Sequence, residues 1–121
     1  MPTFSQQSLD KLATADQRLQ DICNEVIKDY DFTVLCGFRS QEDQDEAVAA
    51  KKSHTPWPTS KHNTTPSQAV DLASYPIDWS DIDRFRELAA RMQVAADKLG
   101  IKIRWGGTFA TIRDYDHFEL V

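Results

Sequence analysis

The chain has few basic residues and no long apolar run. Its 121 residues include 14 Lys and Arg against 19 Asp and Glu, which gives a net charge of −5, and no Lys/Arg block stands out. This acidic balance argues against a nucleic-acid partner and against electrostatic anchoring on an anionic membrane or cell wall. No apolar stretch of the sequence approaches the roughly 20 residues that a membrane-spanning helix needs, so we expect no such helix.

Cysteine is also scarce, with only Cys23 and Cys36 present. Two cysteines rarely make a disulfide framework, so we expect buried free thiols. A metal-ligand role is the alternative, but neither cysteine has a second one at short spacing to support it. Residues 1–7 lack both the basic and the apolar region of a secretory signal, and we therefore expect no such signal.

Apolar residues at helical spacing predict three helices. The length predicts one domain over residues 1–121 with a single core. Each helix begins at a serine that suits the N-cap position. The predicted helices run from about Ser8 to Asp29, from Ser40 to about Lys52, and from Ser80 to Gly100.

Short β-branched or alternating segments predict strands between and after these helices. They are Phe32–Cys36, Gln68–Ala73, Ile101–Trp105 and His117–Val121, with Gly106-Gly107 as a turn. In the last strand Phe118 and Leu120 share the core face, whereas His117 and Glu119 share the other. Helices and strands mix without a regular βαβ alternation. The sequence therefore predicts an α+β domain with a small, mainly antiparallel sheet and about three helices.

Two imidazoles and a carboxylate stand out as candidate metal ligands. His62 lies in a polar, proline-containing loop over residues 53–67, Asp71 interrupts an apolar strand, and His117 begins the last strand. Each residue alone is more often a surface or hydrogen-bonded side chain. Together they match a catalytic zinc site, which needs three protein ligands and a fourth position for water. His54 could also bind a metal, but the residues around it match no motif. We therefore do not include it among the candidate ligands.

A zinc-bound water also needs a carboxylate to take its proton. Asp114, Asp116 and Glu119 all lie near His117 in the sequence. On a regular strand only Glu119 shares the face of His117. Asp114 reaches the metal only if residues 113–116 form a turn or bulge. The pattern alone leaves this choice open.

Several segments together resemble the motifs of one family. They are Gly37-Phe38-Arg39-Ser40 with Gln44, Ser60-x-His62, Ala69-Val70-Asp71, Trp105-Gly106-Gly107 and Asp114-x-x-His117-Phe118. The set is similar to that of the zinc D-alanyl-D-alanine carboxypeptidases and L-alanyl-D-glutamate endopeptidases (peptidase family M15). A short chain of this kind most resembles the bacteriophage endolysins of that family.

The resemblance implies a hedgehog/DD-peptidase-like fold and a set of roles at the site. It implies that His62, Asp71 and His117 bind Zn²⁺ and that Asp114 is the catalytic acid/base. One departure is the step from His62 to Asp71, which at nine residues is longer than the family usually shows. A longer loop is tolerable, although it alters the groove beside the metal and so leaves the cleaved bond open.

Arg39 lies just before the second predicted helix. By pattern it is either a solvated charge or an anion clamp. The resemblance implies the clamp, which would steady the substrate or the tetrahedral intermediate. Ser60 and Gln44 are expected to bind substrate beside it, with Ser60 close to the metal.

The implied function is hydrolysis of an amide bond in the peptide stem of peptidoglycan, as in an L-alanyl-D-glutamate endopeptidase that lyses a bacterial host. A D-alanyl-D-alanine carboxypeptidase, a non-catalytic zinc-containing cell-wall-binding module and a metal-free polar network are the alternatives. We expect a monomer with no nucleic-acid or membrane partner. Without a signal, it would be made in the host cytoplasm and act on the wall after release.

Overall fold

The computed structural model describes residues 2–53, 55–109 and 113–121. Its helices are α1 (Gln6–Leu12), α2 (Gln17–Ile27), α3 (Gln41–Ala49) and α4 (Ile82–Leu99). Its strands are β1 (Phe32–Cys36), β2 (Ala69–Ser74), β3 (Ile103–Trp105) and β4 (His117–Leu120). Two 3₁₀ turns, η1 (Lys61–Asn63) and η2 (Gly106–Thr108), lie in the connections.

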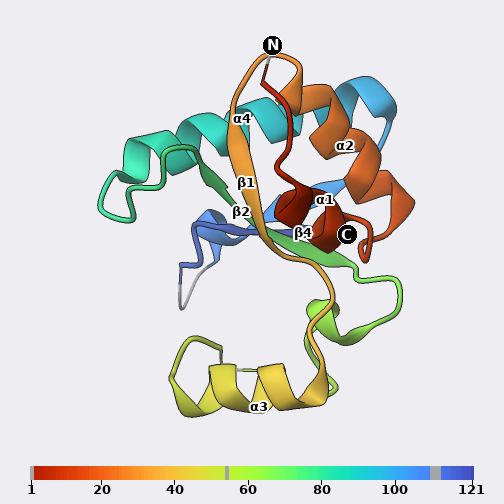
Figure 1. Cartoon of the computed structure of the whole chain (residues 1–121), viewed down its shortest axis with the longest axis vertical. Coiled ribbons are helices and arrows are strands. Elements are labelled where there is room, and N and C mark those ends of the chain that lie inside the picture. Colours follow the sequence, from red (N-terminus) through yellow and green to blue (C-terminus); the bar gives the residue numbers. More distant parts are fainter. Residues whose placement is uncertain (1, 54, 110–112) are drawn as a thin grey trace.

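The strands form one sheet in the order β1-β2-β4-β3, and each neighbouring pair is antiparallel. Figure 1 shows α1, α2 and α4 gathered around the sheet at one end of the molecule and α3 apart from them at the other end. The α+β class and the antiparallel sheet are therefore confirmed. The predicted strand positions hold to within two residues. β3 starts at Ile103 because the N–H of Ile101 still bonds to the Ala96 carbonyl at the end of α4.

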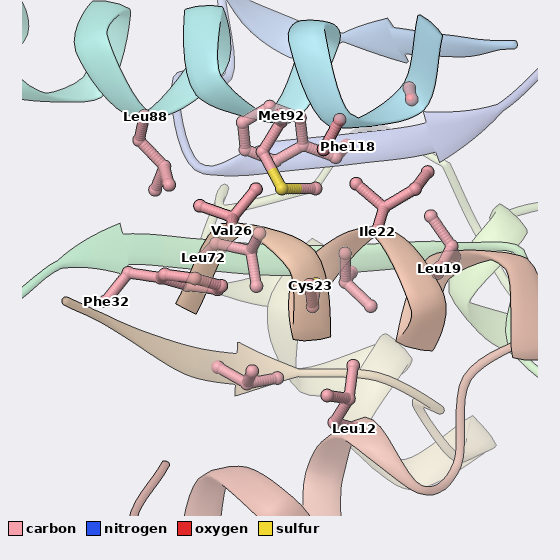
Figure 2. Packing of buried hydrophobic residues seen from close by; sticks show 14 of the residues in the cluster. Leu12, Leu19, Ile22, Cys23, Val26, Phe32, Leu72, Leu88, Met92 and Phe118 are labelled. Carbon is pink, nitrogen blue, oxygen red and sulfur yellow. The ribbon is translucent and has the colours of Figure 1, made fainter. Parts of the chain in front are cut away.

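The apolar core lies between the sheet and the helices α2 and α4 (Figure 2). Leu72 of β2 and Phe118 of β4 are fully buried on this side of the sheet. The side chains that cover them come from the apolar stripes of the two helices, and they are Leu19, Ile22, Val26, Leu88 and Met92. Burial of such side chains is the main favourable contribution to folding.

The prediction of one continuous helix from Ser8 to Asp29 is wrong, because α1 and α2 are separate. Asp16 caps α2 by accepting a hydrogen bond from the N–H of Arg18. The N–H of Asp16 bonds to the Ser67 carbonyl at 2.8 Å, so the loop before β2 holds the turn between the helices. The cap of α1 is Ser5 rather than Ser8. The apolar spacing continues across the turn because residues before and after it still face the same core.

Ser40 caps α3 as predicted, accepting a hydrogen bond from the N–H of Asp43. The helix ends at Ala49, earlier than the predicted Lys52. Lys51 adopts a left-handed backbone conformation with φ 59°, which a helix cannot continue through.

α4 is capped by Asp81, one residue after the predicted Ser80, and its side chain accepts from the N–H of Arg84. Gly100 ends the helix as predicted, in the left-handed conformation with φ 71° that favours glycine at this position. Within the ranges described above, no helix combines the length and apolar character that crossing a bilayer requires.

Candidate metal centre

A row of polar side chains crosses three neighbouring strands of the sheet. Asp71 of β2 pairs with Cys36 of β1 on one side and with His117 of β4 on the other. Residues directly opposite each other in an antiparallel sheet share a face. Because side chains alternate along a strand, this face is opposite to the one on which Leu72 and Phe118 meet the core. The regular register of β2 and β4 brings Asp71 and His117 together, whereas Cys36 comes opposite Asp71 through a register shift in β1 between Val34 and Cys36.

The turn η1 brings His62 to this row. Ser60 is its N-cap, and the Ser60 hydroxyl accepts a hydrogen bond from the N–H of His62 at 3.2 Å. The N–H of Ser60 donates to Asn63 Oδ1 at 3.1 Å, which completes a capping box. His62 is only 2% exposed. This local structure fixes the direction in which the imidazole enters the site.

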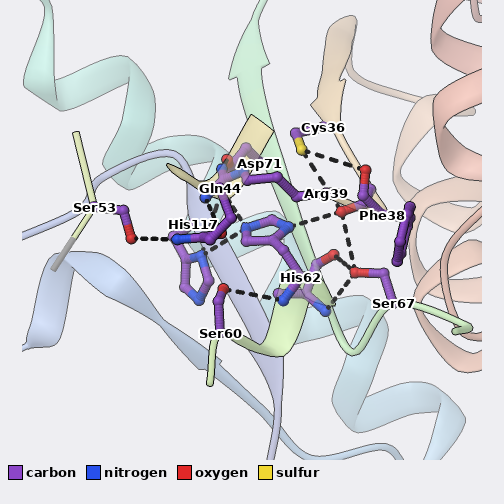
Figure 3. Close-up of polar contacts among 12 residues, drawn as sticks. Cys36, Phe38, Arg39, Gln44, Ser53, Ser60, His62, Ser67, Asp71 and His117 are labelled. Atoms are coloured by element: carbon purple, nitrogen blue, oxygen red, sulfur yellow. Dashed lines mark hydrogen bonds and ion pairs between the residues drawn. The ribbon is translucent and has the colours of Figure 1, made fainter. Parts of the chain in front are cut away.

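Three potential ligand atoms form a compact triangle (Figure 3). His62 Nε2 lies 3.2 Å from Asp71 Oδ1 and 3.2 Å from His117 Nδ1, and the last two atoms are 3.4 Å apart. Nitrogen and oxygen ligands at their usual distances from a tetrahedral Zn²⁺ would be about 3.3 Å from one another. The triangle therefore fits three ligands of such an ion and leaves the fourth position free for water or substrate.

Hydrogen bonds on the far side of each ring select the nitrogen that faces the triangle. His62 Nδ1 is 2.8 Å from the carbonyl oxygen of Gly37, which only accepts, so Nδ1 carries the proton and Nε2 is left as the ligand. His117 Nε2 is 2.8 Å from Glu119 Oε1, which leaves Nδ1 as the ligand. Metal-binding histidines are commonly oriented by such carbonyl and carboxylate partners.

The second oxygen of Asp71 is held by Arg39. Arg39 Nη2 lies 3.1 Å from Asp71 Oδ2, and Arg39 Nη1 donates to Gln44 Oε1 at 3.1 Å. Gln44 is fully buried, and its amide nitrogen donates to Ser53 Oγ at 2.9 Å and to the Thr55 carbonyl at 2.6 Å. Gln44 thus links α3 and the following loop to Arg39, and through Arg39 to the triangle.

The charges of the site reinforce one another. Burial acts to lower the pKa of His62, but the hydrogen bonds and charges of Asp71 and Cys36 raise it to about 10. Burial acts to raise the pKa of Asp71, yet its bonds with His117 and His62 hold it well below its usual range. The hydrogen bond with His117 lowers the pKa of Glu119 to about 2. Positive charge therefore collects between ionised carboxylates, in the place where a metal cation would lie.

Asp114 approaches the triangle from a turn. Strand β4 begins only at His117, and the N–H of His117 bonds back to the Asp114 carbonyl at 3.2 Å. Strand alternation therefore does not apply to Asp114, whose carboxylate lies within 4.8 Å of ligand atoms of Asp71 and His117. Glu119 is instead bonded to the outer nitrogen of His117 and to Lys61, at 3.1 Å. The turn that the sequence left open is present.

Two further groups, which were considered from the sequence but not assigned to the site, lie near it. Burial first, then the hydrogen bond and charge of Asp114 and the charge of Asp71, raise the pKa of Asp116 to about 9. Cys36 is a free, partly exposed thiol with its sulfur within 4.8 Å of ligand atoms of His62 and Asp71. Only its pairing with Asp71 across the sheet could have revealed it, and sequence spacing does not give that pairing.

The predicted burial of free thiols is confirmed for Cys23, which is fully buried, whereas Cys36 is free but only partly buried. His54 lies outside the described residues.

Comparison with known proteins places these observations in a family. The sequence model of the phage L-alanyl-D-glutamate peptidase family matches residues 2–120. The L-alanyl-D-glutamate peptidase of Escherichia phage T5 is 32% identical over 123 residues, covering 97% of this chain and 88% of that protein. The crystal structure of the L-Ala D-Glu endopeptidase ChiX of Serratia marcescens matches with a TM-score of 0.84 and 29% identity, covering 98% of this chain and 89% of that one. The chain belongs to the phage L-alanyl-D-glutamate peptidase family.

Proposed function

We propose that this protein is a zinc-dependent endopeptidase that hydrolyses the L-alanyl-D-glutamate bond in the peptide stem of peptidoglycan. The observation that carries the proposal is the triangle of His62, Asp71 and His117 with the carboxylate of Asp114 beside it. The names of the relatives in phage T5 and Serratia support the bond and the substrate.

Zinc is the ion that these ligands suit best. Two imidazole nitrogens and one carboxylate oxygen form a donor set that Zn²⁺ accepts, whereas Mg²⁺ and Ca²⁺ prefer oxygen ligands alone. The spacing of about 3.3 Å between ligands favours a tetrahedral ion. Zn²⁺ held by His62, Asp71 and His117 would polarise the scissile carbonyl and make water a better nucleophile at neutral pH.

Asp114 is the proposed acid/base. Its carboxylate would take a proton from the attacking water and pass it to the amine that leaves. Burial, together with the neighbouring Asp114, raises the pKa of Asp116 to about 9, so that its carboxyl is protonated at neutral pH. A protonated Asp116 would donate to Asp114, orient that carboxylate and leave its other oxygen available to the water.

Arg39, Ser60 and Gln44 have supporting roles in this proposal. The guanidinium of Arg39 has five N–H donors, of which the contacts with Asp71 and Gln44 use two. The others can steady the substrate or its developing oxyanion. Gln44 is buried with both ends of its amide bonded, and Ser60 caps the turn of His62. We infer that these two act on the substrate by holding Arg39 and His62.

We further propose that the protein is a monomer made in the host cytoplasm, and that it reaches peptidoglycan after release. The phage origin of the T5 relative supports this order of events. Size-exclusion chromatography with light scattering tests the monomer, and a lysis assay with and without permeabilised cells tests the need for release.

The experiment that tests the function is mass analysis of the products released from purified peptidoglycan by zinc-loaded and by chelated protein. We expect zinc-dependent release of stem peptides that begin with D-glutamate. Release of D-alanine instead would identify a carboxypeptidase. No release in either state, with zinc bound, would identify a binding module and contradict the proposal.

Asp114→Ala tests the mechanism in the same assay. We expect it to bind zinc as the unmodified protein does and to lose most activity, about 10²–10⁴-fold, which is the usual contribution of a general acid/base. Asp10→Ala, a change to an exposed carboxylate on α1, is the control and should keep full activity. Full activity of Asp114→Ala with zinc bound would contradict the role.

A further inference from the structure

We propose that Gly106 and the indole of Trp105 position the catalytic carboxylate of Asp114, and that Gly106 is required because of space and not because of its backbone conformation. This inference rests on the proposed role of Asp114. Neither residue reaches the triangle of ligands itself. Both would act on the reaction only through the backbone on which Asp114 lies.

Gly106 lies flush against the backbone of Asp114. The Gly106 carbonyl accepts a hydrogen bond from the N–H of Asp114 at 3.0 Å. A Cβ atom added to Gly106 would lie 2.1 Å from the carbonyl oxygen of Asp114 and 3.0 Å from both its carbonyl carbon and its Cβ. The first distance is far below any van der Waals contact. An alanine at this position must therefore push the Asp114 backbone away, because no flexible side chain is there to move instead.

Trp105 holds the next residue of the same segment. Its indole Nε1 donates to the carbonyl of Tyr115 at 2.7 Å, and the two rings lie 6.0 Å apart. Trp105 is itself fixed by β3, where it pairs with Phe118 of β4. Two consecutive residues, Asp114 and Tyr115, are thus held from β3 and η2 just before β4 begins. These two contacts hold the turn that directs Asp114 toward the ligands. On a regular strand Asp114 would face away from them.

A second glycine shows that the requirement at Gly106 is of a different kind. Gly100 has φ 71°, a conformation that L-residues rarely adopt, and no atom lies within 4 Å of a Cβ built there. Gly100 is therefore needed for its backbone conformation alone, and it lies at the end of α4. Gly106 has no such φ and is limited by its neighbour. The same substitution at the two positions separates loss of stability from loss of geometry at the site.

The test compares Gly106→Ala with Gly100→Ala in the full chain. We expect Gly106→Ala to lower kcat by about 10–100-fold, as displacement of a reacting group by about 1 Å does, with KM and zinc affinity unchanged. Hydrogen exchange at the Asp114 amide should become faster. Gly100→Ala should lower the melting temperature but leave kcat and the Asp114 amide unchanged. Unaltered kcat and exchange in folded Gly106→Ala would overturn the proposal.

A double-mutant cycle distinguishes positioning from a general structural effect. On an Asp114→Ala background, Gly106→Ala should cause little further loss of kcat, because the group that it positions is already absent. Losses that multiply would overturn the positioning role. If Gly106→Ala does not fold, Trp105→Phe is used in the same cycle, because it removes the Nε1 donor to Tyr115 and keeps a smaller aromatic ring. An active Asp114→Ala would refute the mechanism itself, which is a separate outcome.

Discussion

The two faces of strands β2 and β4 are both buried, yet they are built in different ways. On one face Val70, Leu72 and Phe118 pack in the core through contacts that have no preferred direction. On the other face Asp71 and His117 meet His62 through polar contacts of 3.2–3.4 Å between defined atoms. Core packing tolerates changes of similar volume, whereas a polar cluster fails when one partner is lost.

The buried polar groups that the structure describes on this face all have hydrogen-bond partners. Throughout residues 2–53, 55–109 and 113–121, every buried side-chain nitrogen and oxygen has a hydrogen-bond partner. Each ligand has its own support, namely Gly37 for His62, Arg39 for Asp71 and Glu119 for His117. The comparison teaches that one pair of strands supplies stability from one face and chemistry from the other. Neighbouring residues should therefore fail in different ways when they are changed.

His117→Ala and Phe118→Ala break this comparison most directly. We expect His117→Ala to lose metal binding and roughly three orders of magnitude or more of activity, because one of three ligands is absent. In chelator it should be destabilised by less than Phe118→Ala, because Asp71 and Glu119 lose a polar partner but no cavity opens in the core. Phe118→Ala should lower the free energy of unfolding by about 3–5 kcal/mol through the cavity that it leaves. Zinc titration and urea unfolding measure both, and equal destabilisation by the two variants would refute the division.

Variants of Glu119 test how far metal affinity depends on the hydrogen bond to the outer nitrogen of His117. Removing the partner of a metal-bound histidine typically weakens metal affinity by about 10–100-fold. We expect this loss in Glu119→Ala, which frees the outer nitrogen of His117. Glu119→Gln is the matched control, since its amide oxygen can still accept from that nitrogen, and it should lose less. Competition with a zinc chelator measures both, and equal affinities would contradict the role.

The pH dependence of metal binding follows from the raised pKa values. The pKa of His62 is raised to about 10, so at pH 7 the metal-free imidazole of His62 holds a proton that a metal must displace, and the pKa of His117 is shifted in the same direction. Lowering the pH favours the protonated form. Zinc affinity should therefore fall by up to about tenfold per pH unit for each displaced proton.

Calorimetric titration with zinc in two buffers of different ionisation enthalpy, at one pH, gives the number of protons released. We expect at least one at pH 7. Binding without proton release between pH 6 and pH 8 would contradict the raised pKa values.

The core face could largely be predicted from the sequence, because periodicity records which side of an element meets apolar neighbours. The 3,4 spacing in α4 and the alternation around Phe118 gave these elements to within two residues. The candidate ligands His62, Asp71 and His117 were named by type and by resemblance, and the structure brings them together. The sequence could indicate this grouping because Asp71 and His117 lie on strands that pair directly.

The supports of the site could not be predicted, since they depend on contacts between distant segments. The carbonyl of Gly37, the burial of Gln44 and the pairing of Cys36 with Asp71 exist only once the sheet and η1 have formed. The turn before His117 was left open because periodicity describes regular strands and says nothing of the residues that precede one. The break between α1 and α2 was missed for the opposite reason. There a regular apolar pattern continues through an irregular backbone.

Replacing Asp16, at the break between α1 and α2, has the smallest expected effect on stability. It also separates the core face from the polar face most clearly. It caps α2, which covers the core and does not reach the ligands. Asp16→Ala should lower the free energy of unfolding by about 1 kcal/mol, the usual cost of losing an N-cap. Asp21→Ala is the control and should cost less. It removes an exposed carboxylate within α2 that, among the described side chains, is bonded only to Gln17.

Both variants should keep full zinc affinity and activity, as measured beside urea unfolding. Hydrogen bonds from Arg18, first from its side chain and then from its backbone N–H, lower the pKa of Asp16. The contribution of Asp16 should thus be fully present above the unfolded pKa of about 4 and be lost as the pH falls from there through the lower pKa of the folded carboxyl. A loss of zinc affinity in Asp16→Ala would show that the turn, through its bond to Ser67, also holds the loop that carries His62, and the two faces would then be coupled.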